Sequence, residues 1–165
     1  MSATAVAIRL RTMTAADLST VTAIEKASFR RPWSKMMFQD ELDQPFSWHR
    51  VAVDEAGRVQ GYLIGRCYPD VWHLMNLAVE VGVRRRGIGR ALLEEFLAAA
   101  KQAGRSVFLE VRPSNWAAIS LYRASGFAVV GVRPRYYSDN QEDALLMACD
   151  FALSSDHIRG DEQDG

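Results

Sequence analysis

Residues 72–104 read WHLMNLAVEVGVRRRGIGRALLEEFLAAAKQAG. The first eight residues, Trp72 to Val79, are apolar at nearly every position, as in a strand buried on both faces in the middle of a sheet. Apolar side chains then recur at helical spacing, at Ile88, Leu92, Phe96 and Ala100. Gly104 stands where the C-cap of that helix is expected. A second strand pattern, SVFLEV at 106–111, follows. The stretch predicts a strand–helix–strand unit with a parallel crossover.

Weaker patterns flank this unit on both sides. Alternation predicts strands at 8–13, 48–53, 59–67, 127–132 and 144–148, with the second and third joined as a hairpin. Thr14 with Asp17, and separately Ser34, are expected to begin two helices, and a short helix is expected at 115–125. The order β-α-α-β-β-β-α-β-α-β-β predicts an α/β fold, with a mixed central sheet between helices.

The composition suits one domain of ordinary size. The chain has 165 residues, of which 48% are hydrophobic and 24% charged, so a buried core is expected. We expect a folded domain over 1–153. The last residues, 154–165, carry four acidic side chains and one arginine with one large apolar residue, which predicts a flexible acidic tail.

Several function classes are disfavoured by the same composition. Lys plus Arg equals Asp plus Glu at twenty each, so a general nucleic-acid binder is not expected. Cys67 and Cys149 form no CxxC pattern, and with three histidines no metal site is predicted. The chain has no long apolar run and no signal-peptide pattern, so we expect a cytoplasmic protein without a membrane span.

The loop between the strand and the helix is rich in arginine and glycine. Residues Arg84 to Arg90 read RRRGIGR, at the expected start of the helix. Glycines there allow a tight turn, and the free N–H groups of the first helical turn attract an anion. The pattern fits neither a P-loop, which needs Lys-Ser or Lys-Thr, nor a Rossmann fingerprint, which needs a small residue at Leu92. A solvated arginine run is the alternative, but the helix dipole disfavours cations at that end. We therefore predict a pyrophosphate site.

With these residues, the chain resembles the GCN5-related N-acetyltransferase (GNAT) superfamily. The acetyl-CoA signature of that family, Arg/Gln-x-x-Gly-x-Gly/Ala, is matched by Arg84, Gly87 and Gly89. Further motifs are similar to the RimI-like type, which acetylates the N-terminal alanine of a small-subunit ribosomal protein. They are FRRPWS at 29–34, LEVRPSN at 109–115, AISLYRASGF at 118–127, RPRYY at 133–137 and EDALLM at 142–147. The resemblance covers about Ile8 to Phe151. Val81, where the family often has proline, departs from it.

The resemblance implies a site for acetyl-CoA and no metal. The backbone of β-strand residues is expected to bracket the acetyl group and the pantetheine arm, the loop to wrap the pyrophosphate, and an asparagine to bond the pantetheine end. The expected cofactor residues are Leu77, Ala78, Val79, Arg84, Arg85, Arg86, Gly87, Ile88, Gly89, Arg90 and Asn115.

Acetyl transfer to an amine also needs a base, an oxyanion donor and an acid. Glu110 is the candidate base, because it alternates with buried positions of its strand; pairing with Arg112 or another nearby arginine is the alternative. Tyr122 is the candidate acid, since a phenol is protonated at neutral pH; packing between Leu121 and Phe127 is its alternative. The N–H of Val79 is the candidate oxyanion donor.

The acceptor is harder to predict. Trp33, Tyr136 and Tyr137 either line a slot for a peptide N-terminus or pack at the surface. His49 and His73 are expected to be ordinary strand histidines. The leading interpretation is an N-terminal protein acetyltransferase acting on a ribosomal protein, as a monomer or weak dimer. A lysine or small-amine acetyltransferase and a non-catalytic acyl-CoA-binding module remain as alternatives.

Overall fold

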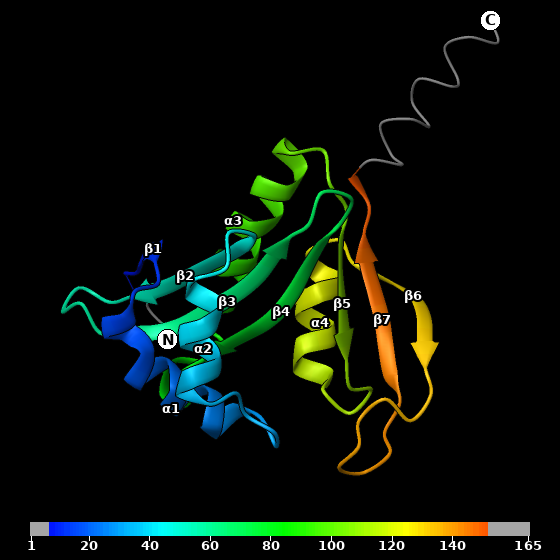
Figure 1. Cartoon of the computed structure of the whole chain (residues 1–165), viewed down its shortest axis with the longest axis horizontal. Coiled ribbons are helices and arrows are strands. Elements are labelled where there is room, and N and C mark those ends of the chain that lie inside the picture. Colours follow the sequence, from blue (N-terminus) through cyan, green and yellow to red (C-terminus); the bar gives the residue numbers. More distant parts are fainter. Residues whose placement is uncertain (1–6, 152–165) are drawn as a thin grey trace, which may run out of the picture. The chain divides into compact units, whose positions relative to one another are not determined.

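A computed structural model describes residues 7–151. The strands are β1 (Arg9–Thr12), β2 (Ser47–Val53), β3 (Val59–Cys67), β4 (Trp72–Val79), β5 (Val107–Val111), β6 (Ala128–Arg133) and β7 (Ala144–Cys149). The helices are α1 (Leu18–Ser28), α2 (Lys35–Leu42), α3 (Ile88–Gln102) and α4 (Trp116–Ala124), with short 3₁₀ turns at Ala15–Asp17 and Val81–Val83. Figure 1 shows them in sequence colours. The predicted order of elements is confirmed.

The sheet is mixed, as predicted. Its strand order is β1-β2-β3-β4-β5-β7-β6, and only the pairing of β4 with β5 is parallel among the pairings that the structure resolves in register. The described chain divides into two compact units. The first contains residues up to Cys67 and Leu74–Phe96, and the second contains Tyr68–His73 and the residues from Leu97 onward. The expected tail at 154–165 lies outside the described residues.

In the first unit, helices lie on both faces of β3. Tyr62 and Ile64 point into a core built with α1 and α2, while Gly61 and Gly65 face α3. A Cβ at Gly65 would lie 2.5 Å from Cζ of the buried Phe96, so only glycine lets the helix approach this closely. The alternation along one strand thus builds two layers of helix around it.

The cap that the sequence predicts for α2 is present, and the predicted Thr14–Asp17 pair caps the 3₁₀ turn that leads into α1. The carboxylate of Asp17 accepts a 2.8 Å hydrogen bond from the N–H of Thr14, and also pairs with Arg11. Ser34 accepts a 3.2 Å hydrogen bond from the N–H of Met37 at the start of α2. These contacts satisfy donors that a helix leaves free at its first turn.

The second unit contains the parallel crossover strand. Trp72 at the start of β4 is in register with Val107 of β5, and β5 continues into an antiparallel ladder with β7 and then β6. The helix α4 ends at a left-handed Gly126, with φ of 101°. In this unit β5 therefore lies between the first two residues of β4 and the strand β7, with Glu110 near the carboxyl end of β5.

Candidate active site

The arginine–glycine loop lies in the first unit, between β4 and α3. Arg85 and Gly87 have φ of 65° and 84°, in the left-handed region that favours glycine. Arg85, Arg86 and Gly87 are exposed, and a Cβ at Gly87 would meet no atom within 4 Å. The backbone here faces open space beside the first turn of α3, whose N–H groups have no partner inside the helix. These residues fit a pyrophosphate group.

Arg84 is oriented differently from the arginines that follow it. Its Nε donates a 3.0 Å hydrogen bond to the carbonyl of Val79, and its NH2 group donates at 3.0 Å to Oγ of Ser28. The guanidinium therefore braces the end of β4 against the end of α1. As a cofactor residue, Arg84 would act through this brace and its backbone.

A buried carboxylate that the sequence did not predict lies beside this strand end. Glu25 of α1 is 1% exposed and accepts hydrogen bonds from Tyr62, from Nδ2 of Asn76 at 2.7 Å and from the N–H of Trp33 at 3.3 Å. Burial raises the pKa of Glu25 above its ordinary value, although these hydrogen bonds lower it. Because its oxygens are occupied, Glu25 organises the region rather than serving as a base.

Trp33 follows α1 at the edge of the core of the first unit. Its ring lies 5.2 Å from that of Phe38, centroid to centroid, and it is partly buried. The backbone N–H of Trp33 is bonded to Glu25 and its ring packs on Phe38, so both its backbone and its side chain are fixed. This geometry fits the packing interpretation and leaves part of the indole accessible.

Glu110 belongs to the second unit, where two cationic or polar groups meet its oxygens. Nε2 of His73 lies 3.2 Å from Oε2, and the guanidinium of Arg133 lies 3.7 Å from Oε1. The side chain of Glu110 is 13% exposed, so it is sheltered yet reachable. The nearby arginine is thus Arg133, whereas Arg112 pairs elsewhere. The ring of His73 also stacks on Phe108 with centroids 4.1 Å apart.

The candidate acid, Tyr122, lies on α4 in the same unit. Its residue exposure is 9%, and its ring packs 5.7 Å from that of Phe127, centroid to centroid. Burial, with a smaller effect of Tyr137, raises the pKa of Tyr122 well above its ordinary value. The phenol therefore stays protonated across the physiological range, as an acid or hydrogen-bond donor requires.

Asn115 begins α4. Its Oδ1 accepts a 3.3 Å hydrogen bond from the N–H of Ala118, which is the N-cap contact of the helix. The cap uses the amide oxygen and leaves the NH2 group available to donate to a ligand. The predicted pantetheine contact is compatible with this orientation.

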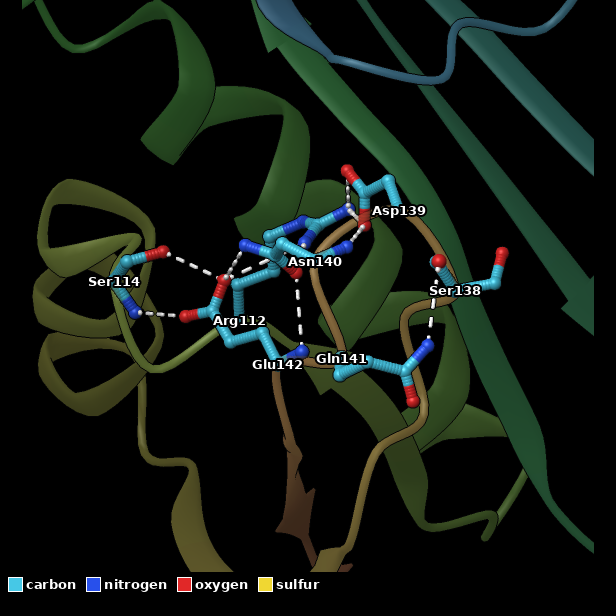
Figure 2. A network of polar contacts seen from close by, with 7 residues as sticks. All are labelled: Arg112, Ser114, Ser138, Asp139, Asn140, Gln141 and Glu142. Carbon is cyan, nitrogen blue, oxygen red and sulfur yellow. Dashed lines mark hydrogen bonds and ion pairs between the residues drawn. The ribbon is translucent and has the colours of Figure 1, made fainter.

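Tyr136 and Tyr137 lie in the β6–β7 loop, residues 134–143. Their rings meet edge to face at 5.0 Å, and Tyr136 is 47% exposed. Burial raises the pKa of Tyr137 to about 12, against a lowering effect of Arg112. Figure 2 shows the polar network that holds this loop, in which Arg112 lies among the side chains of Asp139, Asn140 and Glu142.

The predicted site residues thus fall into two groups. The first unit holds Trp33, the residues 77–79 and the loop 84–90, and the second unit brings together Glu110, Asn115, Tyr122, Tyr136 and Tyr137. The sequence patterns predicted neither Glu25 nor the partnership of His73 with Glu110. The signal that could have identified Glu25 is a charged residue next to Ile24 on the inward face of an amphipathic helix.

Two further findings bear on the site. Among residues 7–151, no helix combines the length and apolar character needed to cross a bilayer. Within the same part of the chain, no group of three or more His, Cys, Asp or Glu side chains is arranged to hold a metal ion.

Residues 18–127 match the family described as "Acetyltransferase (GNAT) family". The N-alpha-acetyltransferase RimI of Mycobacterium tuberculosis is 36% identical over 156 residues, covering 91% of this chain and 97% of that protein. The crystal structure of the ribosomal-protein-S18-alanine N-acetyltransferase from Escherichia coli superposes with a TM-score of 0.79 at 32% identity, covering 87% and 93% of the two chains. That of Ard1 from Thermoplasma volcanium gives 0.80 at 30% identity, covering 87% and 97%.

The chain therefore belongs to the GNAT acetyltransferase family, as the resemblance implied. It is an acetyltransferase homologous to N-α-acetyltransferases, and the family uses acetyl-CoA as its acetyl donor.

Proposed function

We propose that this enzyme transfers the acetyl group of acetyl-CoA to the N-terminal α-amino group of a protein, with the N-terminal alanine of ribosomal protein bS18 as acceptor. The observation that carries the proposal is the exposed stretch Arg84–Gly87, with left-handed Arg85 and Gly87, immediately before α3. The acceptor rests on likeness, since relatives over nearly their whole length are N-α-acetyltransferases, one of them described as acting on bS18.

The assignment of the cofactor residues rests on the family resemblance. In this proposal, the backbone of Leu77, Ala78 and Val79 and the loop 84–90 hold the acetyl and pyrophosphate ends, and the NH2 group of Asn115 bonds the pantetheine. Acetyl-CoA supplies a thioester, whose carbonyl carbon accepts the amine. The N–H of Val79 stabilises the negative charge that develops on the carbonyl oxygen.

Glu110 receives the proton that the amine gives up, directly or through a water molecule. An α-amine has a pKa of about 8, against about 10.4 for lysine. A larger fraction of the α-amine is therefore neutral at pH 7, and it needs less help from a base than a lysine side chain does. His73 at Oε2 and Arg133 at Oε1 orient this carboxylate.

Tyr122 donates a hydrogen bond to the departing thiolate. A thiol has a pKa of about 8.5, below that of a buried phenol, so complete proton transfer from Tyr122 is uphill. The hydroxyl therefore stabilises the thiolate as charge builds, and solvent completes the protonation. Tyr136 and Tyr137 of the second unit line the path of the acceptor. Such an enzyme works in the cytoplasm, where the ribosome is made, without contacting nucleic acid itself.

The proposal is tested by turnover of acetyl-CoA with short peptides that begin with Ala, Ser, Gly or Met and end in the same sequence. We expect turnover to be fastest with the Ala peptide that carries the first residues of bS18. A control peptide of the same sequence with a blocked N-terminus is expected to give no turnover. Equal turnover of the blocked peptide, through an internal lysine, would make the enzyme a lysine acetyltransferase. Binding of acetyl-CoA without turnover of any peptide would support a binding module.

A further inference from the structure

We propose that Arg112 is a positioning residue that holds the β6–β7 loop in the conformation that receives the acceptor peptide. The inference rests on the proposed function, because Tyr136 and Tyr137 of this loop are assigned to the acceptor. It assigns to Arg112 a role in acceptor binding without contact with the reacting atoms.

The guanidinium of Arg112 makes the contacts that tie the loop to the end of β5. One of its nitrogens donates to both oxygens of Asp139, at 3.0 and 2.9 Å, and the other donates to Asn140 at 3.0 Å. Glu142 lies 3.4 Å from the second nitrogen. Figure 2 shows these side chains converging on Arg112 from the loop. Only arginine offers a planar fork of donors with this geometry.

The same guanidinium covers one of the candidate acceptor residues. Its Cζ lies 3.9 Å from the centroid of the Tyr137 ring, within the range of a cation–π contact. Tyr137 in turn meets Tyr136 edge to face. Fixing Tyr137 therefore fixes the direction of the more exposed tyrosine beside it.

Glu142 extends the network to the start of α4. Its carboxylate accepts hydrogen bonds from the N–H of Ser114 at 3.0 Å and from its hydroxyl at 3.1 Å. Its backbone carbonyl accepts the N–H of Tyr137 at 3.1 Å. The loop is therefore anchored to residues 112–114, immediately before Asn115. Asn115 itself is held by its own cap contact with Ala118, which does not involve Arg112.

The loop needs such a support because its own backbone is strained. Arg135 and Gln141 have φ of 50° and 59°, a region that side chains other than glycine occupy at a cost in energy. The loop also brings Asp139 and Glu142 together, and these carboxylates repel each other when no cation lies between them. Loss of Arg112 removes this cation together with its hydrogen bonds to Asp139 and Asn140, and leaves the contacts of Glu142 with Ser114 as the remaining anchor. We expect the loop then to sample other conformations.

The test compares Arg112→Met with Arg105→Met, since Arg105 is an arginine of the same unit whose guanidinium bonds only a neighbouring carbonyl among the contacts described. For Arg112→Met, the KM for the Ala-first peptide is expected to rise about tenfold or more, while the KM for acetyl-CoA changes by less than about threefold. Arg112→Lys is expected to recover only part of the loss, because lysine lacks the fork. Arg105→Met is expected to behave as the unaltered enzyme.

Hydrogen exchange measured on the same variants gives a readout independent of the acceptor. We expect amides of residues 134–143 to exchange at least about tenfold faster in Arg112→Met, with the rest of the unit unchanged. If Arg112→Met does not fold, Asp139→Asn serves in its place with a smaller effect in the same direction. Unaltered exchange of the loop, or equal increases in both KM values, would overturn the proposal. If no peptide is acetylated by the unaltered enzyme, the proposed function fails while the exchange result still decides the role of Arg112.

Discussion

Nε2 of His73 lies 3.2 Å from Oε2 of Glu110, although 37 residues separate them in the chain. The contact exists because the first residues of β4 pair in parallel with β5, which places His73 in register with Phe108. Stacking on Phe108 fixes the imidazole plane, and the hydrogen bond then fixes the carboxylate. The candidate base is thus oriented from a neighbouring strand.

Replacing this histidine tests the orientation directly. His73→Phe keeps an aromatic ring on Phe108 and removes both imidazole nitrogens, including the Nε2 that meets Glu110. We expect kcat to fall about three- to tenfold, the cost of one hydrogen bond, with acetyl-CoA affinity unchanged. Steady-state kinetics and calorimetric titration with acetyl-CoA measure the two quantities. An unaltered kcat would mean that the contact does not serve Glu110.

The second prediction concerns Tyr122. Tyr122→Phe keeps the packing on Phe127 and removes the hydroxyl, so we expect kcat to fall at least about tenfold with little change in thermal stability. Because burial raises the pKa of Tyr122, its phenol remains protonated as the pH rises to about 10, the ordinary value for tyrosine. The pH profile of kcat is therefore expected to show no loss from this group up to that pH. A descending limb near pH ~9 that disappears in Tyr122→Phe would contradict the assignment.

A third prediction tests the packing of α3 on β3. Gly65→Ala places a Cβ 2.5 Å from Cζ of Phe96, whose ring is fully buried. We expect the free energy of unfolding to fall by about 1–3 kcal/mol, measured by urea denaturation. Gly82→Ala is the matched control, since a Cβ there meets nothing within 4 Å. Equal losses of stability for the two substitutions would show that α3 does not pack closely on Gly65 of β3.

The fourth prediction is a pH dependence of stability. Arg11, hydrogen-bonded to Asp17, holds the pKa of that carboxyl below its ordinary value, and the N–H of Thr14 adds to this against the opposing effect of burial. At neutral pH the carboxyl of Asp17 is ionised in both the folded and the unfolded protein, so its full contribution to the free energy of unfolding is present there. As the pH falls below about 4, the unfolded state takes up the proton first, and the contribution disappears as the pH falls through the lowered pKa.

Asp17→Asn is therefore expected to lower the free energy of unfolding by about 1–3 kcal/mol at pH 7. The difference from the unaltered protein is expected to shrink below pH 4, when urea denaturation is repeated at pH 7, 5 and 3. A difference that stays constant over this range would show that the ionised carboxylate contributes nothing.

Local patterns in the sequence predicted the elements well. The bounds of β4 and β3 agree with the expected strands. The mostly apolar run of β4 ends before Glu80, and turn residues, Gly57 before and Pro69 after, flank β3. The hairpin and the helix caps are likewise set by neighbours in the chain. The arginine–glycine loop was found by its composition, since its function needs free backbone amides rather than distant partners.

Contacts between distant segments could not be predicted from such local patterns. His73 meets Glu110 only through the register of β4 on β5, which no pattern within either strand fixes. Glu25 is buried because Tyr62, Asn76 and Trp33 donate to it from three other segments. Arg112 was considered as a partner for Glu110, whereas in the structure it pairs with Asp139, 27 residues further along the chain.

The central claim is acetyl transfer to an α-amine with Glu110 as base, and one measurement addresses it most directly. The enzyme and its Glu110→Gln variant are given acetyl-CoA and one peptide that begins with Ala and contains an internal lysine, and tandem mass spectrometry locates the acetyl group. We predict acetyl only on the α-amine, with a rate about a hundredfold lower in the variant and unchanged acetyl-CoA affinity. Acetyl on the lysine, or equal rates for the two proteins, would contradict the account.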